Sequence, residues 1–131
     1  MDGSLDTNVL LRLATGDVPE QLRRAKALLG KPGARYVVAD AAWIEIAYAL
    51  EHHYGLGRDG IADVVRSLMS IDSVSADTPT IEATCASFLV SPKLSFTDCY
   101  LAARAATIGA TPLFTFDQTL ANQHQAARLV P

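Results

Sequence analysis

Four acidic residues stand in stretches of apolar or small residues, where a carboxylate without a partner would be costly to bury. They are Asp6, Glu45, Asp98 and Asp117. Buried carboxylates persist when an ion pair, hydrogen bonds or a metal ion satisfies them, and the surrounding stretches offer few basic partners. Carboxylate oxygens without an accompanying set of His or Cys suit a hard ion such as Mg²⁺ or Mn²⁺ better than zinc. The pattern therefore indicates a divalent-cation site.

Each of these acids also has a structural explanation when it is taken alone. Asp6 and Asp117 are good helix caps, and Ser95 with Asp98 matches a capping box. Glu45 is harder to explain in this way, because its helix face carries small residues where other structure approaches closely. The functional interpretation thus depends on whether the four acids come together.

The elements that position these acids alternate between strand and helix. Helix signals include the caps just named, Asp17 and Asp40 as caps of the second and third helices, Pro in a first turn and Gly after a last turn. We expect helices over about 7–15, 17–29, 41–54, 58–69, 78–89 and 95–108, with a short one starting at Asp117. We expect one short strand that ends at Leu5, and further strands at 36–39, around Val74, at 112–116 and at 127–130. The strand at 112–116 is apolar, and we expect it to be buried.

This alternation predicts an α/β fold in which a parallel sheet is covered by helices on both faces. Ligands of such sheets bind outside the carboxyl ends of the strands. Three of the four acids fall at strand ends or helix starts, so we expect them to gather at this edge.

The length of 131 residues fits a single domain spanning 1–131, and half of the residues are hydrophobic, enough to bury a core. Apolar runs fall short of a membrane span, so we expect a soluble, cytoplasmic protein with no membrane partner. Cys85 and Cys99 lie in apolar helical patterns and read as core residues.

The formal net charge of −3 argues at first against a nucleic-acid partner. If the four acids bind a cation, however, the eleven basic residues exceed the ten other acids by one. Arg23, Arg24 and Lys26, followed by Lys31 and Arg35, form either a modest phosphate-binding edge or an ordinary solvated helix face. A polyanionic substrate is compatible with this balance.

The sequence resembles the PIN-domain ribonucleases, and more narrowly the VapC-type toxins of toxin–antitoxin pairs. The likeness covers nearly the whole chain and rests on four pieces in order. These are LDTNVLL at 5–11, WIEIA at 43–47, Thr97-Asp98 before the Leu-Ala-Ala helix, and TFD at 115–117.

The resemblance implies a three-layer α/β/α sandwich with a small parallel sheet and a Mg²⁺- or Mn²⁺-dependent endoribonuclease. Water activated by the metal would attack an RNA phosphodiester in line. Asp6 and Asp98 would bind the metal directly, and Glu45 and Asp117 would act through water or a second ion. Asn8 and Thr115 match the supporting polar residues of such sites.

The resemblance also implies a homodimer and a cognate antitoxin whose tail fills the acidic groove. Large apolar residues flank Glu45 on its helix, and they suit either a dimer or antitoxin surface or an ordinary core. They are Trp43, Ile44, Ile46 and Tyr48.

Two other functions fit parts of the sequence. One is a PIN fold without catalysis that serves as an RNA-binding or assembly module. The other is a metal-dependent phosphatase of the haloacid dehalogenase kind, whose first strand also ends in Asp. That chemistry needs a second Asp two residues later, and Asn8 stands there.

Overall fold

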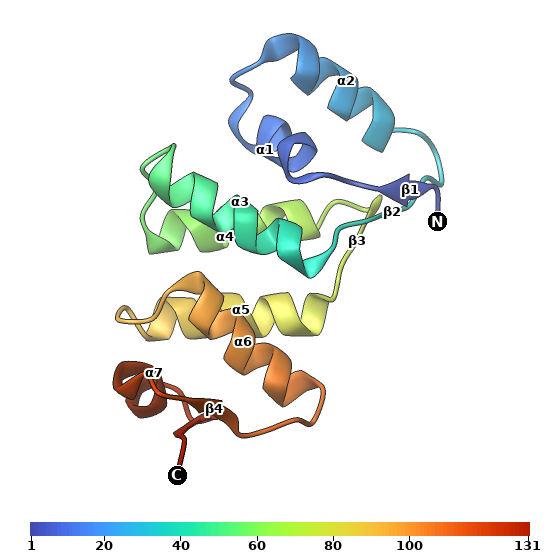
Figure 1. Ribbon diagram of the computed structural model, residues 1–131. Coiled ribbons are helices and arrows are strands. Elements are labelled where there is room, and N and C mark those ends of the chain that lie inside the picture. The colour runs from blue at the N-terminus through green and yellow to red at the C-terminus, as the bar shows by residue number, and fades with distance from the viewer.

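Short parallel strands alternate with helices along the chain, as the sequence predicts. The computed structural model describes residues 1–131. The strands are β1 (Gly3–Ser4), β2 (Tyr36–Val37), β3 (Val74–Ser75), β4 (Leu113–Thr115) and β5 (Ala127–Leu129). The helices are α1 (Thr7–Thr15), α2 (Pro19–Leu29), α3 (Asp40–His52), α4 (Arg58–Met69), α5 (Thr78–Val90), α6 (Phe96–Thr107) and α7 (Gln118–Gln123). The α/β class with a small parallel sheet is confirmed (Figure 1).

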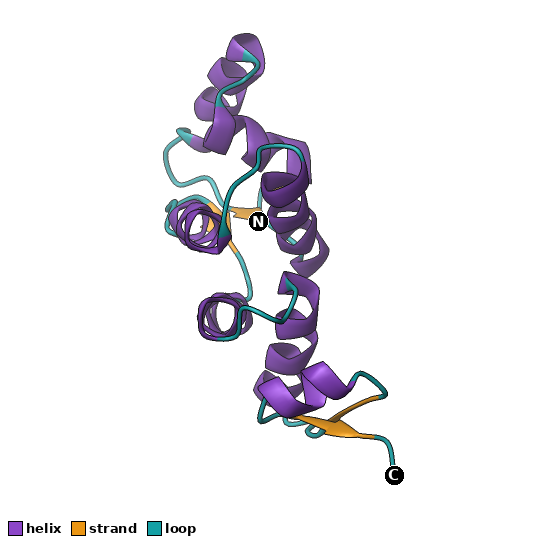
Figure 2. Ribbon diagram, turned by 90° about the vertical axis from the view of Figure 1, so that its left-hand side faces the viewer, coloured by secondary structure: helices purple, strands orange, loops and turns teal.

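The five strands are divided between two parallel sheets. One sheet has the order β1-β2-β3, and the other consists of β4 and β5 alone. Figure 2 shows strands in two separate places, one near the N-terminus and one near the C-terminus. Because β4 pairs with β5 and not with β1, β1 remains an edge strand. The expectation that all strand ends share one edge is therefore wrong for β4.

Helix ends follow the capping signals in most places. Asp6 caps α1 by accepting a hydrogen bond from the Thr7 amide at 2.7 Å. The helix stops at Gly16, whose φ of 62° is a left-handed conformation that glycine adopts readily. Ser95 caps α6 by accepting from the Asp98 amide at 3.1 Å. These bonds satisfy amide groups that a helix start would otherwise leave without partners.

Two acids expected at helix starts do not act as caps. The residues at the N-cap positions of α2 and α3 are Val18 and Ala39. Asp17 instead accepts a hydrogen bond from the Tyr54 hydroxyl at 2.7 Å, and this bond lowers the pKa of the Asp17 carboxyl. A tertiary partner thus replaces the local one at this position.

The core runs through both halves of the molecule as one cluster of 25 buried residues. Trp43 and Ile46 of α3 are fully buried in this cluster. These two residues therefore belong to the core and not to a dimer or antitoxin surface. Both cysteines are buried and free, and burial raises the pKa of each thiol to about 11. None of the helices combines the length and apolar character that a membrane span requires.

The β4 strand is not the buried strand that its apolar sequence predicts. Phe114 is 54% exposed and Phe116, just after the strand, is 86% exposed. The two-stranded sheet of β4 and β5 lies at one end of the molecule, so part of its apolar surface faces solvent (Figure 1). Isolation from the other three strands explains the exposure.

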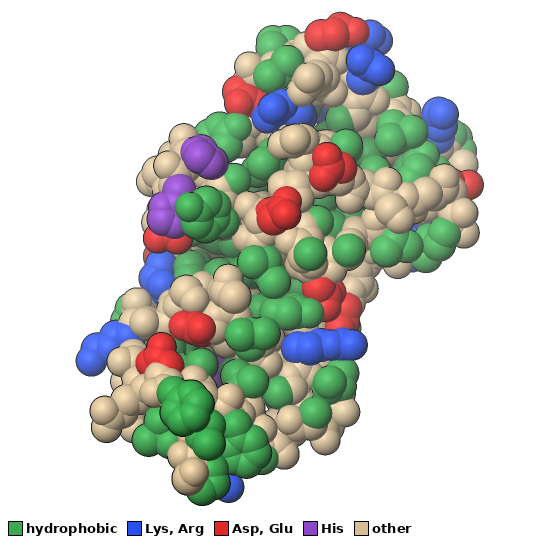
Figure 3. All heavy atoms as spheres, in the orientation of Figure 1, with side chains coloured by type: hydrophobic (Ala, Val, Ile, Leu, Met, Phe, Trp, Pro, Cys, Tyr) green, Lys and Arg blue, Asp and Glu red, His purple; other side chains and the backbone are tan.

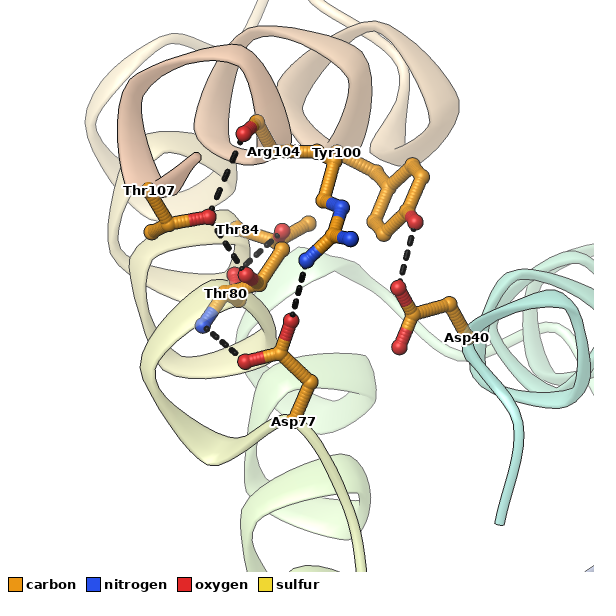
Figure 4. Close-up of polar contacts among 7 residues, drawn as sticks. All are labelled: Asp40, Asp77, Thr80, Thr84, Tyr100, Arg104 and Thr107. Atoms are coloured by element: carbon orange, nitrogen blue, oxygen red, sulfur yellow. Dashed lines mark hydrogen bonds and ion pairs between the residues drawn. The ribbon is translucent and has the colours of Figure 1, made fainter. Parts of the chain in front are cut away.

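Polar contacts join the starts of α3 and α5 to α6 (Figure 4). Tyr100 of α6 donates its hydroxyl to the Asp40 carboxylate at 2.5 Å, and burial raises the pKa of Tyr100 to about 12. Arg104, one turn later, pairs with Asp77 at 2.9 Å. Asp77 also caps α5 through the Thr80 amide. Asp40 and Asp77 follow β2 and β3, so α6 is fastened to the carboxyl end of the sheet.

Replacing Asp77 with Asn should make the free energy of unfolding less dependent on pH in the acid range. Hydrogen bonding from Thr80 lowers the pKa of Asp77, against the opposing effect of burial, and Arg104 lowers it further. A lowered folded pKa adds stability above the unfolded value of about 3.9, which is lost as pH falls through the folded pKa. We expect Asp77→Asn to cost about 0.5–1 kcal/mol at neutral pH, since the pair is partly exposed.

Denaturant midpoints measured from neutral to acid pH check this prediction. The difference between wild type and Asp77→Asn should shrink below about pH 4, where the wild-type carboxyl becomes protonated. Asp72→Asn, at an exposed acid nearby, serves as the control. A difference that stays constant across the whole pH range would show that the charge is not what stabilises.

Candidate functional site

Asp6 and Glu45 lie on two sides of one buried threonine. Thr7 donates its hydroxyl to Oε2 of Glu45 at 2.8 Å, and its amide donates to Asp6 Oδ1 at 2.7 Å. Thr7 is only 8% exposed, so its hydroxyl is held in place by packing. The end of β1, the start of α1 and the middle of α3 are thereby joined, and the two carboxylates are held near each other by one residue.

The four carboxylates are more exposed than their sequence surroundings predict. Asp6, Glu45 and Asp117 are exposed, and Asp98 is half-buried. The apolar neighbours explain the difference, because they occupy the buried positions themselves: Leu5 before Asp6, for example, is 6% exposed. Asp6, Glu45 and Asp117 therefore do not carry the cost of burial that their sequence surroundings suggest.

None of these four carboxylates is neutralised by a basic side chain. The ion pairs of the structure use other acids, and they join Arg12 to Asp17, Arg23 to Glu20, His52 to Glu51, Arg66 to Glu82 and Arg104 to Asp77. The four acids are accordingly negative groups that remain available to a cation from solution. The sequence predicts few basic partners around these acids, and the ion pairs agree with that prediction.

A groove of about 470 Å³ lies beside Glu45. Its lining residues are Thr7, Asn8, Leu11, Ile44, Glu45, Tyr48, Ala49, His53 and Thr97. They come from α1, α3 and α6, with His53 directly after α3, so three helices meet here, as Figure 1 shows for α1 and α3. Asn8, expected to support the acids, is on the wall of this groove.

Asp98 is next to this groove rather than among its lining residues. Its neighbour Thr97 lines the groove, and both belong to the first turn of α6. The Asp98 amide makes the capping bond to Ser95, so its carboxylate is not used for capping. Position at a helix start therefore leaves the Asp98 carboxylate available for another partner.

Asp117 and Thr115 are at a distance from the groove. Asp117 follows β4 and caps α7 by accepting from the Leu120 amide at 3.1 Å. The Thr115 hydroxyl accepts from the Asp117 amide at 2.9 Å. In Figure 1, β4 and α7 are at the end of the molecule opposite α1 and α2. The structural interpretation of Asp117 as a cap describes what the residue does here.

The structure does not gather the four acids into one cluster. No three Asp, Glu, His or Cys side chains are close enough together to hold a metal ion. Figure 3 shows the acidic side chains spread over this face instead of meeting at one point. The division of the strands accounts for the separation of Asp117, because the end of β4 is not beside the end of β1.

The donor chemistry nevertheless fits a hard cation at the Thr7 junction. Asp6 and Glu45 offer carboxylate oxygens, and Mg²⁺ is usually held in proteins by one or two carboxylates with the remaining positions filled by water and substrate phosphate. A set of three protein ligands is thus not required at such a site.

A second groove of about 410 Å³ continues from Asn8 between α1 and α2. Arg12 and Arg24 line this groove. Arg23 does not line it and forms an ion pair with Glu20. Of the basic group noted in the sequence, Arg24 is the residue placed next to the candidate site. It supports the idea of a modest phosphate-binding edge.

The role of Thr7 cannot be predicted from the sequence alone. This residue reads as one of several cap residues after β1, and the structure makes it the bridge to Glu45, thirty-eight positions away. A hydroxyl next to Asp6 was the available signal, but the pairing depends on how α1 packs on α3.

Comparison with known proteins identifies the family. The family model described as PIN domain matches residues 4–124. No curated protein matches the chain. The match includes Asp6, Glu45, Asp98 and Asp117 and runs from Ser4 of β1 past β4, so the last strand, β5, lies outside it. The chain therefore belongs to the PIN-domain family.

Proposed function

We propose that the protein is a Mg²⁺- or Mn²⁺-dependent endoribonuclease that acts as the toxin of a type II toxin–antitoxin system. PIN domains are in general nucleases, so membership of the family supports hydrolysis of nucleic-acid phosphodiesters. The observation that carries the proposal is the junction of Asp6, Thr7 and Glu45. Its two carboxylates lack basic partners, and Thr7 and Glu45 line a groove.

In this proposal Asp6 and Asp98 bind the ion directly, and Glu45 and Asp117 act through water or a second ion. A bound Mg²⁺ would lower the pKa of a water molecule and neutralise charge that develops on the phosphoryl oxygens. Thr7 occupies Oε2 of Glu45, which leaves Oε1 to orient the attacking water and accept its proton. Asn8 hydrogen-bonds the substrate or a carboxylate from the groove wall.

Asp117 has the least support among the proposed residues. It is placed with Thr115 on the separate β4–α7 segment, and its carboxylate is used as a helix cap. A role in cleavage requires this segment to approach the end of β1. We therefore assign Asp117 and Thr115 a supporting role.

The proposed partners follow from the same site. RNA is the substrate, and a cognate antitoxin would block cleavage by placing a basic side chain against the unneutralised acids. The toxin assignment also includes a homodimer. Because Trp43 and Ile46 are core residues, only Ile44 and Tyr48 of the four apolar residues flanking Glu45 are left to contribute to a partner surface.

Expression in a growing bacterial host tests the toxin assignment. Wild type should arrest growth and produce new RNA ends, whereas Asp98→Asn, which keeps the amide that bonds Ser95, should do neither. Equal arrest by both proteins, or arrest by neither, would contradict the assignment.

The separation of Asp117 and the absence of a three-ligand cluster favour one alternative, a PIN fold that binds RNA without cutting it. Under that alternative, purified wild type binds RNA and leaves its length unchanged in Mg²⁺. Metal-dependent cleavage that is lost in Asp6→Asn would exclude it.

Replacing Thr7 with Val should slow cleavage about tenfold without unfolding the protein. Valine keeps the shape of the buried side chain but removes the hydroxyl that holds Glu45, and a hydrogen bond to a charged group contributes about 1.5–3 kcal/mol. Thr7→Ser restores the hydroxyl and should recover most of the rate. Rates measured under single-turnover conditions check this, and equal rates for Thr7→Val and wild type would mean that the bond does not position Glu45 for catalysis.

A further inference from the structure

Tyr48 is an exposed aromatic residue one helical turn after Glu45. It is 59% exposed, whereas Trp43 and Ile46 of the same helix are fully buried and Leu50 is 1% exposed. Residues three apart on a helix share a face, so Tyr48 and Glu45 line the same groove. The core does not explain why a large aromatic ring stands at this position.

The Tyr48 ring contacts two histidine rings that follow it by about one helical turn. The ring centroids of Tyr48 and His52 are 4.2 Å apart with an interplanar angle of 39°. His53 meets Tyr48 edge to face at 6.3 Å and also lines the groove. Figure 3 shows histidine side chains gathered at the left edge of the face, beside an exposed hydrophobic side chain. The result is a small aromatic surface next to Glu45.

The groove around this surface combines apolar and polar side chains, and it carries no permanent positive charge. Asn8 and Thr97 supply an amide and a hydroxyl group that both donate and accept hydrogen bonds, whereas Thr7 donates its hydroxyl to Glu45. No Lys or Arg is among the lining residues, so the groove is unsuited to a phosphate. A neutral, planar group with hydrogen-bonding edges matches these walls.

We propose that this groove binds one unpaired nucleobase of a single-stranded RNA, stacked on Tyr48, next to the phosphate that faces Glu45. The proposal rests on the proposed function and specifies the form of its substrate. Proteins recognise single-stranded RNA by stacking splayed bases on aromatic side chains and hydrogen-bonding their edges. The volume of about 470 Å³ is within the usual range of ligand pockets.

The geometry also separates the roles of the two grooves. The α1–α2 groove is lined by Arg12, which pairs with Asp17, and by Arg24, which takes part in no ion pair and is suited to the negatively charged backbone. The groove at Tyr48 receives the base, and Asn8 lines both. An RNA strand that follows both grooves passes Asp6 and Glu45 between its backbone contacts and its bound base.

Fluorescence anisotropy with two short labelled chains tests this assignment, with Ca²⁺ present in place of Mg²⁺. One chain is oligoadenylate, and the other is an abasic ribose-phosphate chain of the same length and charge. Wild type should bind oligoadenylate about tenfold more tightly, in line with the stacking of one base on one aromatic residue. Tyr48→Ala should lose this preference while keeping its affinity for the abasic chain, and Tyr48→Phe should retain it.

Phe114→Ala is the matched control, because Phe114 is similarly exposed at 54% but belongs to β4. It should keep the full preference for oligoadenylate. The assignment is overturned if wild type binds both chains equally, or if Tyr48→Ala keeps the preference. It is also overturned if Tyr48→Ala changes only self-association, measured by sedimentation, since the surface then serves a second copy of the chain.

The readout is binding and not cleavage, so the two proposals fail separately. A base preference that depends on Tyr48, in a protein that leaves RNA uncut in Mg²⁺, contradicts only the nuclease. Cleavage without such a preference contradicts only the nucleobase groove.

Discussion

Replacing Asp6 with Asn should reduce the rate of RNA cleavage by roughly 10²–10³-fold, the range seen when a key electrostatic group is removed from an active site. Asn keeps the size of the side chain and caps helices as well as Asp does, so α1 should start normally. What the substitution removes is the negative charge beside Thr7. Rates at saturating Mg²⁺ on a labelled RNA measure the effect.

The comparison with other acids makes this result specific. Asp63→Asn, at an exposed position of α4, should cleave RNA like wild type. Asp117→Asn should lose less activity than Asp6→Asn, because Asp117 is placed away from the groove. If Asp6→Asn and Asp63→Asn cleave at the same rate, the Thr7 junction is not the catalytic centre.

Replacing Arg58 with Ala should destabilise the fold by about 2–4 kcal/mol. Arg58 begins α4, and its guanidinium donates to the carbonyl oxygens of Phe88, Ser91 and Leu94 at 2.8, 3.0 and 2.6 Å. It also stacks on the Phe88 ring at 3.6 Å. These contacts fix the loop between α5 and α6, so alanine leaves three carbonyls without this donor.

Thermal unfolding checks this prediction, with a decrease in Tm on the order of 10 °C expected. Arg58→Lys should recover only part of the loss, since one ammonium group cannot reproduce a planar fork of donors. Arg35→Ala is the control, because Arg35 is exposed and its guanidinium makes no hydrogen bond. A melting temperature for Arg58→Ala equal to that of Arg35→Ala would show that the clamp contributes little.

Local signals were sufficient to predict most elements of this fold. The helix Arg58–Met69 has the bounds that its sequence indicates, and Gly16 and Ser95 mark helix ends as expected. The cap assignments of Asp17 and Asp40 were wrong, because these carboxylates accept hydrogen bonds from Tyr54 and Tyr100 instead. Contacts between distant helices decide such cases, and no local pattern contains them.

The order of the strands in the sheets could not be predicted from the sequence pattern. Alternating helices and strands predict parallel pairing but not which edges meet. Strands of two or three residues form few ladder bonds, so helix packing has a large share in deciding their neighbours. The same limit applies to the site: Asp6 and Glu45 meet through Thr7, whereas Asp117 follows β4 into the other sheet.

The exposure of side chains was only partly predictable. On α3, Trp43 and Ile46 turn inward and Glu45 and Tyr48 turn outward. Helical spacing separates these two faces, but the sequence allows either face to be the partner surface. The packing of α1, α4 and α6 around α3 settles that question.

Removal and return of the metal ion is the most direct test of a cation-dependent nuclease at Asp6 and Glu45. Purified wild type is given a labelled RNA in Mg²⁺, then with excess EDTA, and then with Mg²⁺ restored. Cleavage should occur, stop and resume, and Asp6→Asn should remain inactive throughout. Cleavage that continues in EDTA, or wild type that leaves RNA intact in Mg²⁺, would contradict the account.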